Sequence, residues 1–232
     1  MHLLRNYCTD LLHLCFPHNC EGCGSDIVKD DQFLCARCVH RMPSTRFFST
    51  PGNAVEKLFY GRLPLSNASA AFYFTKSSLL QHLVTQLKYK NNKEAGYFLG
   101  RMMGLVLRAS TRFNEVDMLV PLPLHPEKEH SRGYNQAMLI CEGISEIWKR
   151  PIEKQAVART QFTETQTQQN RLSRWQNMEG VFALKEAERI RGRHILLVDD
   201  VITTGATLEA CGAAILRAGN CSLSIAAAAY TL

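Results

Sequence analysis

The sequence predicts an α/β protein with a mostly parallel sheet, preceded by a small cysteine-rich module. After residue 70, short apolar segments of strand length alternate with longer segments whose apolar residues recur at helical spacing. This alternation is typical of a parallel sheet flanked by helices. Near the start of the chain, four cysteines occur in two C-x-x-C pairs, in a stretch with few other residues to bury. The 232 residues therefore suit one medium-sized domain with a small appendage.

The composition is that of an ordinary globular protein. Hydrophobic residues make up 46% of the chain and charged residues 21%, which excludes disordered, collagen-like and coiled-coil proteins. The longest apolar runs, 195–198 and 225–230, have the length of strands and fall well short of the ~20 residues of a membrane-spanning helix. We therefore expect no membrane span and a cytoplasmic location, where paired cysteines bind metal more often than they form disulfides.

The N-terminal part of the chain predicts a short helix followed by a zinc module. Residues 1–16 have apolar positions at helical spacing, and Cys20, Cys23, Cys35 and Cys38 follow them. Four thiolates presented by two tight turns suit tetrahedral Zn²⁺, and with every position filled by protein the metal is expected to be structural. A redox dithiol or a pair of disulfides is the alternative, and neither accounts for two such pairs in a glycine-rich segment.

Proline and glycine set the expected domain boundaries. Residues 46–69 are rich in both, and we expect them to link an N-terminal module, 1–45, to a domain of residues 70–232. Within that domain we expect strands at 70–74, 116–120, 181–184, 195–198 and 223–230, and helices at 79–87, 94–108, 135–148 and 208–217. The polar segment 159–179 is expected to be a loop.

Two adjacent carboxylates, Asp199 and Asp200, come directly after the apolar run 195–198. Ligands of open α/β sheets bind where parallel strands end, and neighbouring carboxylates repel each other unless they serve a ligand. Next come Thr203, Thr204, Gly205, Ala206 and Thr207, which open a helix. Backbone N–H groups, hydroxyls and a helix N-terminus together form a phosphate site. The pattern predicts a site for a phosphorylated sugar, with a threonine-capped helix as the alternative.

The segment from Ile195 to Thr207 closely resembles the signature with which type I phosphoribosyltransferases bind 5-phosphoribosyl 1-pyrophosphate (PRPP). The resemblance implies the fold of that family. It also implies that Asp199 and Asp200 bind the ribose hydroxyls, that residues 203–207 hold the 5-phosphate, and that Mg²⁺ binds the pyrophosphate.

Together with the paired cysteines, further motifs resemble the ComF family of competence-associated phosphoribosyltransferase-like proteins. These motifs are Leu87-Lys-Tyr-Lys90, Pro121-Leu-Pro-Leu-His125, Arg132-Gly-Tyr-Asn-Gln136, Gln166-Thr167, Arg174-x-x-Asn177 and Gly180-x-Phe182. Members of the family are linked to the uptake of single-stranded DNA during natural transformation. The resemblance therefore implies a role in DNA uptake, with helicase and recombination proteins as partners. The residues identify neither the acceptor nucleophile nor a catalytic side chain.

Basic residues supply further candidate contacts to pyrophosphate or DNA: Lys88, Lys90, Arg132, Arg159, Arg171 and Arg174. The family fold places a mobile lid at 159–179. The net charge of +6 arises in residues 51–115, which carry nine basic and three acidic residues. This segment is expected to track the backbone of single-stranded DNA, with Tyr89 and Tyr97 as stacking groups, or to be a solvated face. The sequence leaves open PRPP turnover, PRPP sensing without turnover, and DNA handling on the same fold.

Overall fold

The computed structural model describes residues 19–26, 28, 32–160 and 180–231. The expected helix at 1–16 and the candidate residues Arg171 and Arg174 lie outside these ranges. The chain divides into two compact units, Met1–Met42 and Pro43–Leu232. Within the described residues, no helix is long and apolar enough to cross a membrane.

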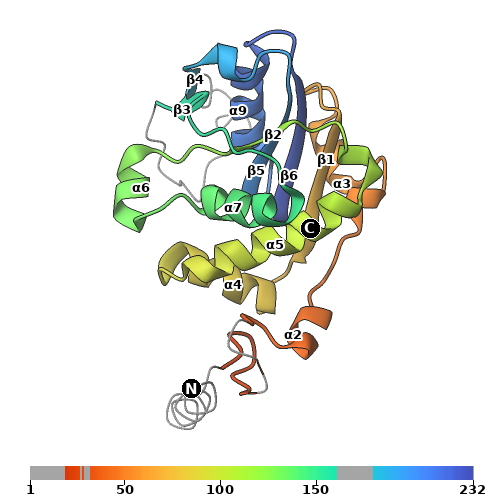
Figure 1. The fold of residues 1–232 in the computed structure, drawn as a ribbon, viewed down its shortest axis with the longest axis vertical. Helices are drawn as coiled ribbons and strands as arrows, with labels where there is room; N and C mark the ends of the chain where they lie inside the picture. Colours follow the sequence, from red (N-terminus) through yellow and green to blue (C-terminus); the bar gives the residue numbers. More distant parts are fainter. Residues whose placement is uncertain (1–18, 27, 29–31, 161–179, 232) are drawn as a thin grey trace, which may run out of the picture. The chain divides into compact units, whose positions relative to one another are not determined.

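Four parallel strands form the central sheet of the second unit, in the order β1-β6-β5-β2 (Figure 1). Their bounds are Asn67–Phe74 for β1, Met118–Pro121 for β2, His194–Ile202 for β5 and Ser222–Thr231 for β6. The two central strands, β5 and β6, are continuous apolar runs because a parallel sheet is covered on both faces. The predicted mostly parallel sheet is confirmed.

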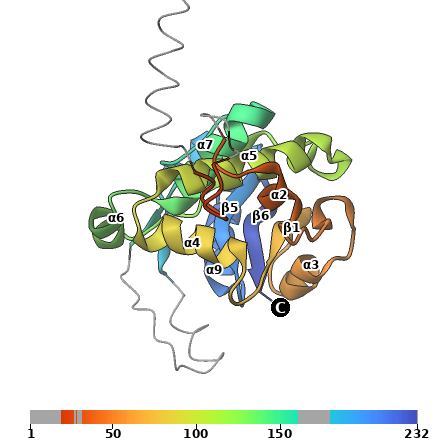
Figure 2. The same ribbon diagram turned by 90° about the horizontal axis from the view of Figure 1, so that it is seen from below.

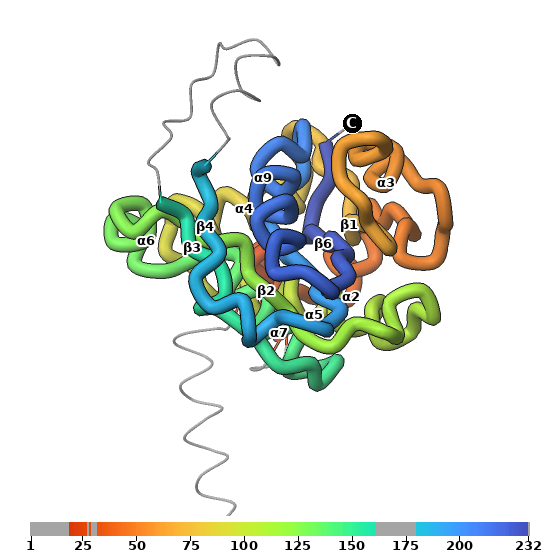
Figure 3. The backbone as a smooth tube through the Cα atoms, turned by 90° about the horizontal axis from the view of Figure 1, so that it is seen from above, coloured from red at the N-terminus to blue at the C-terminus, as the bar shows by residue number. Residues whose placement is uncertain are grey.

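Helices cover both faces of this sheet. Figures 2 and 3 show α5 and α7 on one face of the sheet and α9 on the other, and Figure 1 shows α4 beyond the carboxyl ends of the strands. These helices span Leu79–Tyr89 (α4), Lys93–Ala109 (α5), Gln136–Trp148 (α7) and Ala206–Leu216 (α9). A shorter helix, α6, spans Pro126–Arg132. Three 3-10 helices span Phe47–Ser49 (η1), Thr111–Phe113 (η2) and Ala187–Arg189 (η3). Two short strands, β3 (Val157–Arg159) and β4 (Phe182–Leu184), form a separate antiparallel pair. Side-chain caps at Ser78, Asn92 and Asn135 begin α4, α5 and α7.

The backbones of α5 and α7 are in contact where Gly100 faces Gly143. A Cβ atom on Gly100 would lie 2.2 Å from the carbonyl oxygen of Ile140 and 2.9 Å from the Cα atom of Gly143. Gly96 and Gly104, one turn away on either side, also face α7 without room for a larger side chain. A glycine at every fourth position of α5 therefore sets how closely the two helices pack against each other.

Residues 46–69, expected to be a linker, are instead folded into the second unit. They form α3, Ala54–Phe59, and bury Val55 and Phe59 in the same core as β5 and α9. Asn53 begins α3: its side chain accepts hydrogen bonds from two N–H groups of the first turn and donates to the carbonyl of Ala68. The glycines that suggested a linker, Gly52 and Gly61, have positive φ and occupy the turns around α3.

Candidate functional site

Asp199 and Asp200 lie near the carboxyl end of β5, on the side of the sheet where the parallel strands end. Successive side chains of a strand point to opposite faces, so the two carboxylates have different neighbours. Asp199 is partly buried and lies near Cys211 of α9: burial raises the pKa of that thiol, and the charge of Asp199 raises it further. Asp200 is 6% exposed and faces Lys88, at the end of α4.

Lys88 forms an ion pair with Asp200, and its Nζ atom is 2.9 Å from Oδ2 of that residue. Burial by itself lowers the pKa of Lys88, but the charge and hydrogen bond of Asp200 outweigh burial, and the pKa is raised overall. Lys88 therefore stays protonated inside the site. This ion pair places one of the candidate basic contacts directly against the acidic pair.

The pKa of Asp199 is raised well above that of an ordinary carboxyl group. Burial and then the charge of Asp200 raise the pKa of Asp199 to about 7, although Lys88, a backbone N–H and Arg159 act in the opposite direction. That N–H belongs to Asp200 and donates to Oδ1 of Asp199 at 2.8 Å. Burial and the neighbouring charge thus disfavour the ionised form of Asp199, and a ligand that supplies a cation or hydroxyl donors would favour it.

Residues 203–207 surround a hollow between the end of β5 and the start of α9. Asp199 and residues 201–208 line it, and it encloses about 230 Å³ of space, part of it open to solvent. The N–H groups in the first turn of a helix lack acceptors within the helix and attract anions. The structure therefore brings all five residues of the predicted phosphate loop together, next to Asp199.

Gly205 is required at the turn between β5 and α9 for two reasons. Its φ is +73°, a conformation that costs other residues roughly 1–2 kcal/mol. A Cβ atom here would also lie 2.9 Å from the ring of Phe59 and 3.1 Å from the side chain of Leu58. The segment expected to be a linker thus packs directly against the predicted phosphate loop.

Two more of the candidate basic residues lie near the acidic pair. Arg159, on β3, is half-buried: burial lowers its pKa and the charge of Asp199 opposes that shift. Arg132, the last residue of α6, is close enough to Lys88 to oppose the rise of its pKa. Lys90 is exposed at the end of α4. The structure thus brings Lys88, Arg132 and Arg159 towards the site and leaves Lys90 at the surface.

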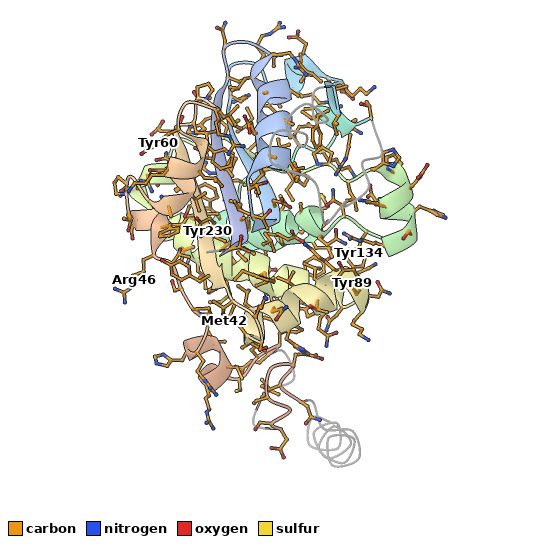
Figure 4. All side chains as sticks on the ribbon, turned by 180° about the vertical axis from the view of Figure 1, so that it is seen from behind. Met42, Arg46, Tyr60, Tyr89, Tyr134 and Tyr230 are labelled. Atoms are coloured by element: carbon orange, nitrogen blue, oxygen red, sulfur yellow. The ribbon has the colours of Figure 1, made fainter. Side chains whose placement is uncertain are left out.

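The Arg132-Gly-Tyr-Asn-Gln136 motif joins three elements at the site. The hydroxyl of Tyr134 donates to the carbonyl of Leu87 in α4, and the Asn135 amide donates to the carbonyl of Leu122, which follows β2. Figure 4 labels both Tyr134 and Tyr89, the last residue of α4. The motif therefore positions the start of α7 against the ends of α4 and β2.

Gln136 is a residue of that motif whose place at the site the sequence analysis missed. It is 4% exposed, and its Oε1 atom accepts a hydrogen bond of 3.0 Å from Arg132. Its Nε2 atom has no hydrogen-bond partner within the part of the chain that the structure describes. A polar residue at the first position of an apolar helix was the signal available in the sequence.

The positive segment 51–115 is not a continuous basic face. Within the described residues, four of its nine basic side chains form ion pairs, which are Arg62 with Glu209, Lys88 with Asp200, Arg101 with Glu94 and Glu146, and Arg112 with Glu56. Of the two expected stacking groups, Tyr97 is hydrogen-bonded to Glu142, which raises its pKa. Tyr89 is 71% exposed, with the Arg132 guanidinium 5.8 Å from the centroid of its ring.

In the N-terminal unit, the Sγ atoms of Cys20, Cys23, Cys35 and Cys38 all lie within 4.8 Å of one another. Those of Cys23 and Cys35 are 3.8 Å apart. This matches the edge of about 3.8 Å that a zinc tetrahedron with Zn–S bonds of about 2.3 Å would have. The helix α2, Ala36–His40, starts directly after Cys35 and carries Cys38. The donor set and its spacing therefore fit a structural zinc ion.

The pKa values of two thiols in this cluster are shifted in opposite directions. Burial raises the pKa of Cys20, but N–H groups of Cys35 and Gly22, which donate to its sulfur at 3.2 and 3.4 Å, help to lower it to about 6. Burial and the neighbouring sulfur atoms raise the pKa of Cys38 to about 12. A bound cation would favour the thiolate at every position.

Comparisons with known proteins agree with this geometry. Residues 142–231 match the family described as the phosphoribosyl transferase domain. The chain is 30% identical over 210 residues to the DNA utilization protein YhgH of Escherichia coli O157:H7, covering 89% of this chain and 87% of the relative. It is 29% identical over 198 residues to competence protein F of Haemophilus influenzae, covering 84% and 76%.

Among solved structures, an adenine phosphoribosyltransferase from Leishmania donovani is 11% identical, with a TM-score of 0.38, over 77% of this chain and 69% of that chain. This similarity is too low to support any conclusion about function. The bacterial relatives, in contrast, match the present chain over most of their length. The chain therefore belongs to the ComF family, together with the DNA utilization protein YhgH and competence protein F, and carries a phosphoribosyltransferase-type domain.

Proposed function

We propose that this protein binds PRPP with Mg²⁺ at the junction of β5 and α9. The observation that supports this most directly is that Asp199, the neighbour of Asp200, lines the same hollow as residues 203–207. Carboxylates accept hydrogen bonds from vicinal ribose hydroxyls, and the loop offers the donors that a 5-phosphate needs. We further propose that the protein works in the cytoplasm in DNA utilization, as the names of its relatives suggest.

The residues around the site suit transfer of the ribosyl group. Departure of pyrophosphate builds positive charge at C1 of the ribose and negative charge on the leaving group. Lys88 and Arg159 lie close enough to the acidic pair to stabilise that negative charge. Bound Mg²⁺ would supply further charge neutralisation at the pyrophosphate. The Lys88–Asp200 ion pair has to rearrange when the ribose hydroxyls bind.

Calorimetric titration of PRPP with Mg²⁺ tests this proposal. We expect wild-type protein to bind, and Asp200→Asn to weaken binding about 10- to 100-fold, because hydrogen bonds to charged groups contribute about 1.5–3 kcal/mol. Glu188→Gln, which removes a carboxylate from an exposed position, is the matched control and should bind normally. Following pyrophosphate release in the same samples separates turnover from sensing. Absence of binding at millimolar PRPP, or unchanged binding by Asp200→Asn, would refute the proposal.

Handling of single-stranded DNA on the same fold is the second candidate, and the exposed ring of Tyr89 favours it. The ring lies between Lys88 and Lys90 in the sequence, next to the Arg132 guanidinium. Aromatic rings at the surface with cations beside them bind single strands by stacking and by phosphate contacts. A base stacked on this ring would lie near the mouth of the proposed PRPP site.

Fluorescence anisotropy with a labelled oligonucleotide tests the DNA proposal. Tyr89→Ala is expected to weaken single-strand binding about 5- to 100-fold, because stacking contributes about 1–3 kcal/mol per base. Lys90→Glu should weaken binding further and reduce its dependence on salt. Lys57→Glu, which makes the same change of charge at an exposed position of α3, is the control. If Tyr89→Ala and Lys90→Glu bind as the wild type does, this surface does not contact DNA.

We also propose that the four clustered cysteines hold one structural Zn²⁺ ion. The distance between sulfur atoms and the all-thiol donor set support this. With four protein ligands, the ion would have no open position for substrate.

A further inference from the structure

Arg62 follows α3 and joins three parts of the second unit behind the phosphate loop. Its Nη1 atom donates to the carbonyl of Leu58 at 2.9 Å and to the carbonyl of Thr204, within the loop, at 3.2 Å. Its Nη2 atom donates a hydrogen bond to the carboxylate of Glu209 in α9 and forms an ion pair with it, 147 residues further along the chain. One side chain thus connects the end of α3, the loop and the helix that follows it.

The contact with Thr204 determines which way one peptide group of the loop faces. The C=O of Thr204 and the N–H of Gly205 belong to the same planar trans peptide, in which these two groups point in opposite directions. Because Arg62 holds the carbonyl, the N–H of Gly205 must point away from Arg62. Phe59 and Leu58 pack against Gly205 on the α3 side and restrict the alternative orientation.

The contact with Glu209 determines the charge of the loop. Glu209 is 9% exposed and lies in the first turn of α9. A buried carboxylate at this end of a helix would repel a phosphate that approaches the same N-terminus. The Arg62 guanidinium neutralises it in a partly buried ion pair. The approaching anion therefore meets a neutral pair in place of a net negative charge.

We propose that Arg62 is a positioning residue for the phosphate loop. It keeps the carbonyl of Thr204 turned away from the anion, so that the N–H of Gly205 faces it, and it neutralises Glu209. This inference rests on the proposed binding of a phosphoribosyl ligand at the loop. It adds that phosphate affinity depends on a residue from the segment before β1, outside the sequence motif.

Titration of ribose 5-phosphate into four variants tests the inference. Arg62→Met is expected to weaken binding at least tenfold. Adding Glu209→Gln to Arg62→Met should recover a large part of that loss, because the unpaired carboxylate is gone. Arg62→Lys keeps the charge but lacks the second nitrogen, so it should lie between wild type and Arg62→Met. Arg112→Met is the matched control, since Arg112 also joins a glutamate to backbone carbonyls, away from the loop.

Two further measurements separate positioning from general stability. Thermal unfolding should show Arg112→Met and Arg62→Met both destabilised, whereas only Arg62→Met loses affinity. The amide resonance of Gly205 should shift in Arg62→Met and stay in place in Arg112→Met. Equal affinity losses in the two variants, or wild-type affinity in Arg62→Met, would overturn the inference. If wild-type protein binds neither PRPP nor ribose 5-phosphate, the proposed function fails, while an unmoved Gly205 resonance would count against the role of Arg62 independently.

Discussion

Replacement of Gly100 by alanine is expected to destabilise the second unit by ~3 kcal/mol or more. The added methyl group would lie 2.2 Å from a backbone carbonyl oxygen of α7, and the backbone of a packed helix can move away only if the two helices separate. Overpacking of a core typically costs about 1–3 kcal/mol, and a clash with backbone lies at or above the upper end. Intrinsic helix propensity works in the opposite direction, because alanine is favoured over glycine by about 1 kcal/mol.

Urea unfolding followed by circular dichroism measures this effect. Arg108→Ala, at an exposed position of the same helix, is the control and should change stability by less than about 0.5 kcal/mol. Because helix propensity alone would stabilise the alanine variant by about 1 kcal/mol, a Gly100→Ala protein more stable than the wild type would show that α5 and α7 do not approach at this residue.

Removal of the proposed zinc ion is expected to unfold the N-terminal unit and to leave the second unit folded. Among the described residues, the N-terminal unit buries few hydrophobic side chains apart from its cysteines. They are Val28, Phe33, Leu34 and Met42. Structural zinc in small modules contributes ~10 kcal/mol or more to folding, far more than this small apolar cluster. The second unit has its own sheet and core and should keep its cooperative unfolding.

Elemental analysis and limited proteolysis measure this effect. Wild-type protein should contain one zinc ion per chain, and Cys38→Ser or a chelator should remove it and make the N-terminal unit sensitive to protease. Cys221→Ser, at a partly buried cysteine outside the cluster, should keep the metal. Purified protein that resists protease equally with and without a chelator would contradict a zinc-dependent fold.

Local patterns predicted much of this protein. The apolar run before Asp199 and the helical spacing of apolar residues in 79–87 and 135–148 depend on residues close together in the chain. Strands β5 and β6 and helices α4, α5 and α7 accordingly lie within a few residues of their predicted positions. The same is true of the two C-x-x-C pairs, because a tight turn brings two thiols together whatever the rest of the chain does.

The segment 46–69 shows where predictions from local patterns fail. The density of proline and glycine predicted a linker, but Val55 and Phe59 are buried in the core. Burial of their apolar surface stabilises the segment within the second unit, although turns flank them. Net charge was also a poor guide, because ion pairs form between residues that are far apart in the sequence. Arg62 and Lys88 counted towards a basic face, yet both pair with carboxylates from the C-terminal part of the chain.

Local sequence patterns predict the alternation of strands and helices, the four thiols and the motif that follows β5, because each of these depends on residues close together in the chain. Which residues meet across the site depends on how distant segments pack. The strand order β1-β6-β5-β2 places the first strand beside the last, so the chain around α3 packs against the loop at Gly205. Lys88 meets Asp200, and Arg62 meets Glu209, for the same physical reason: burial of the shared core brings distant segments together and leaves their charges to pair.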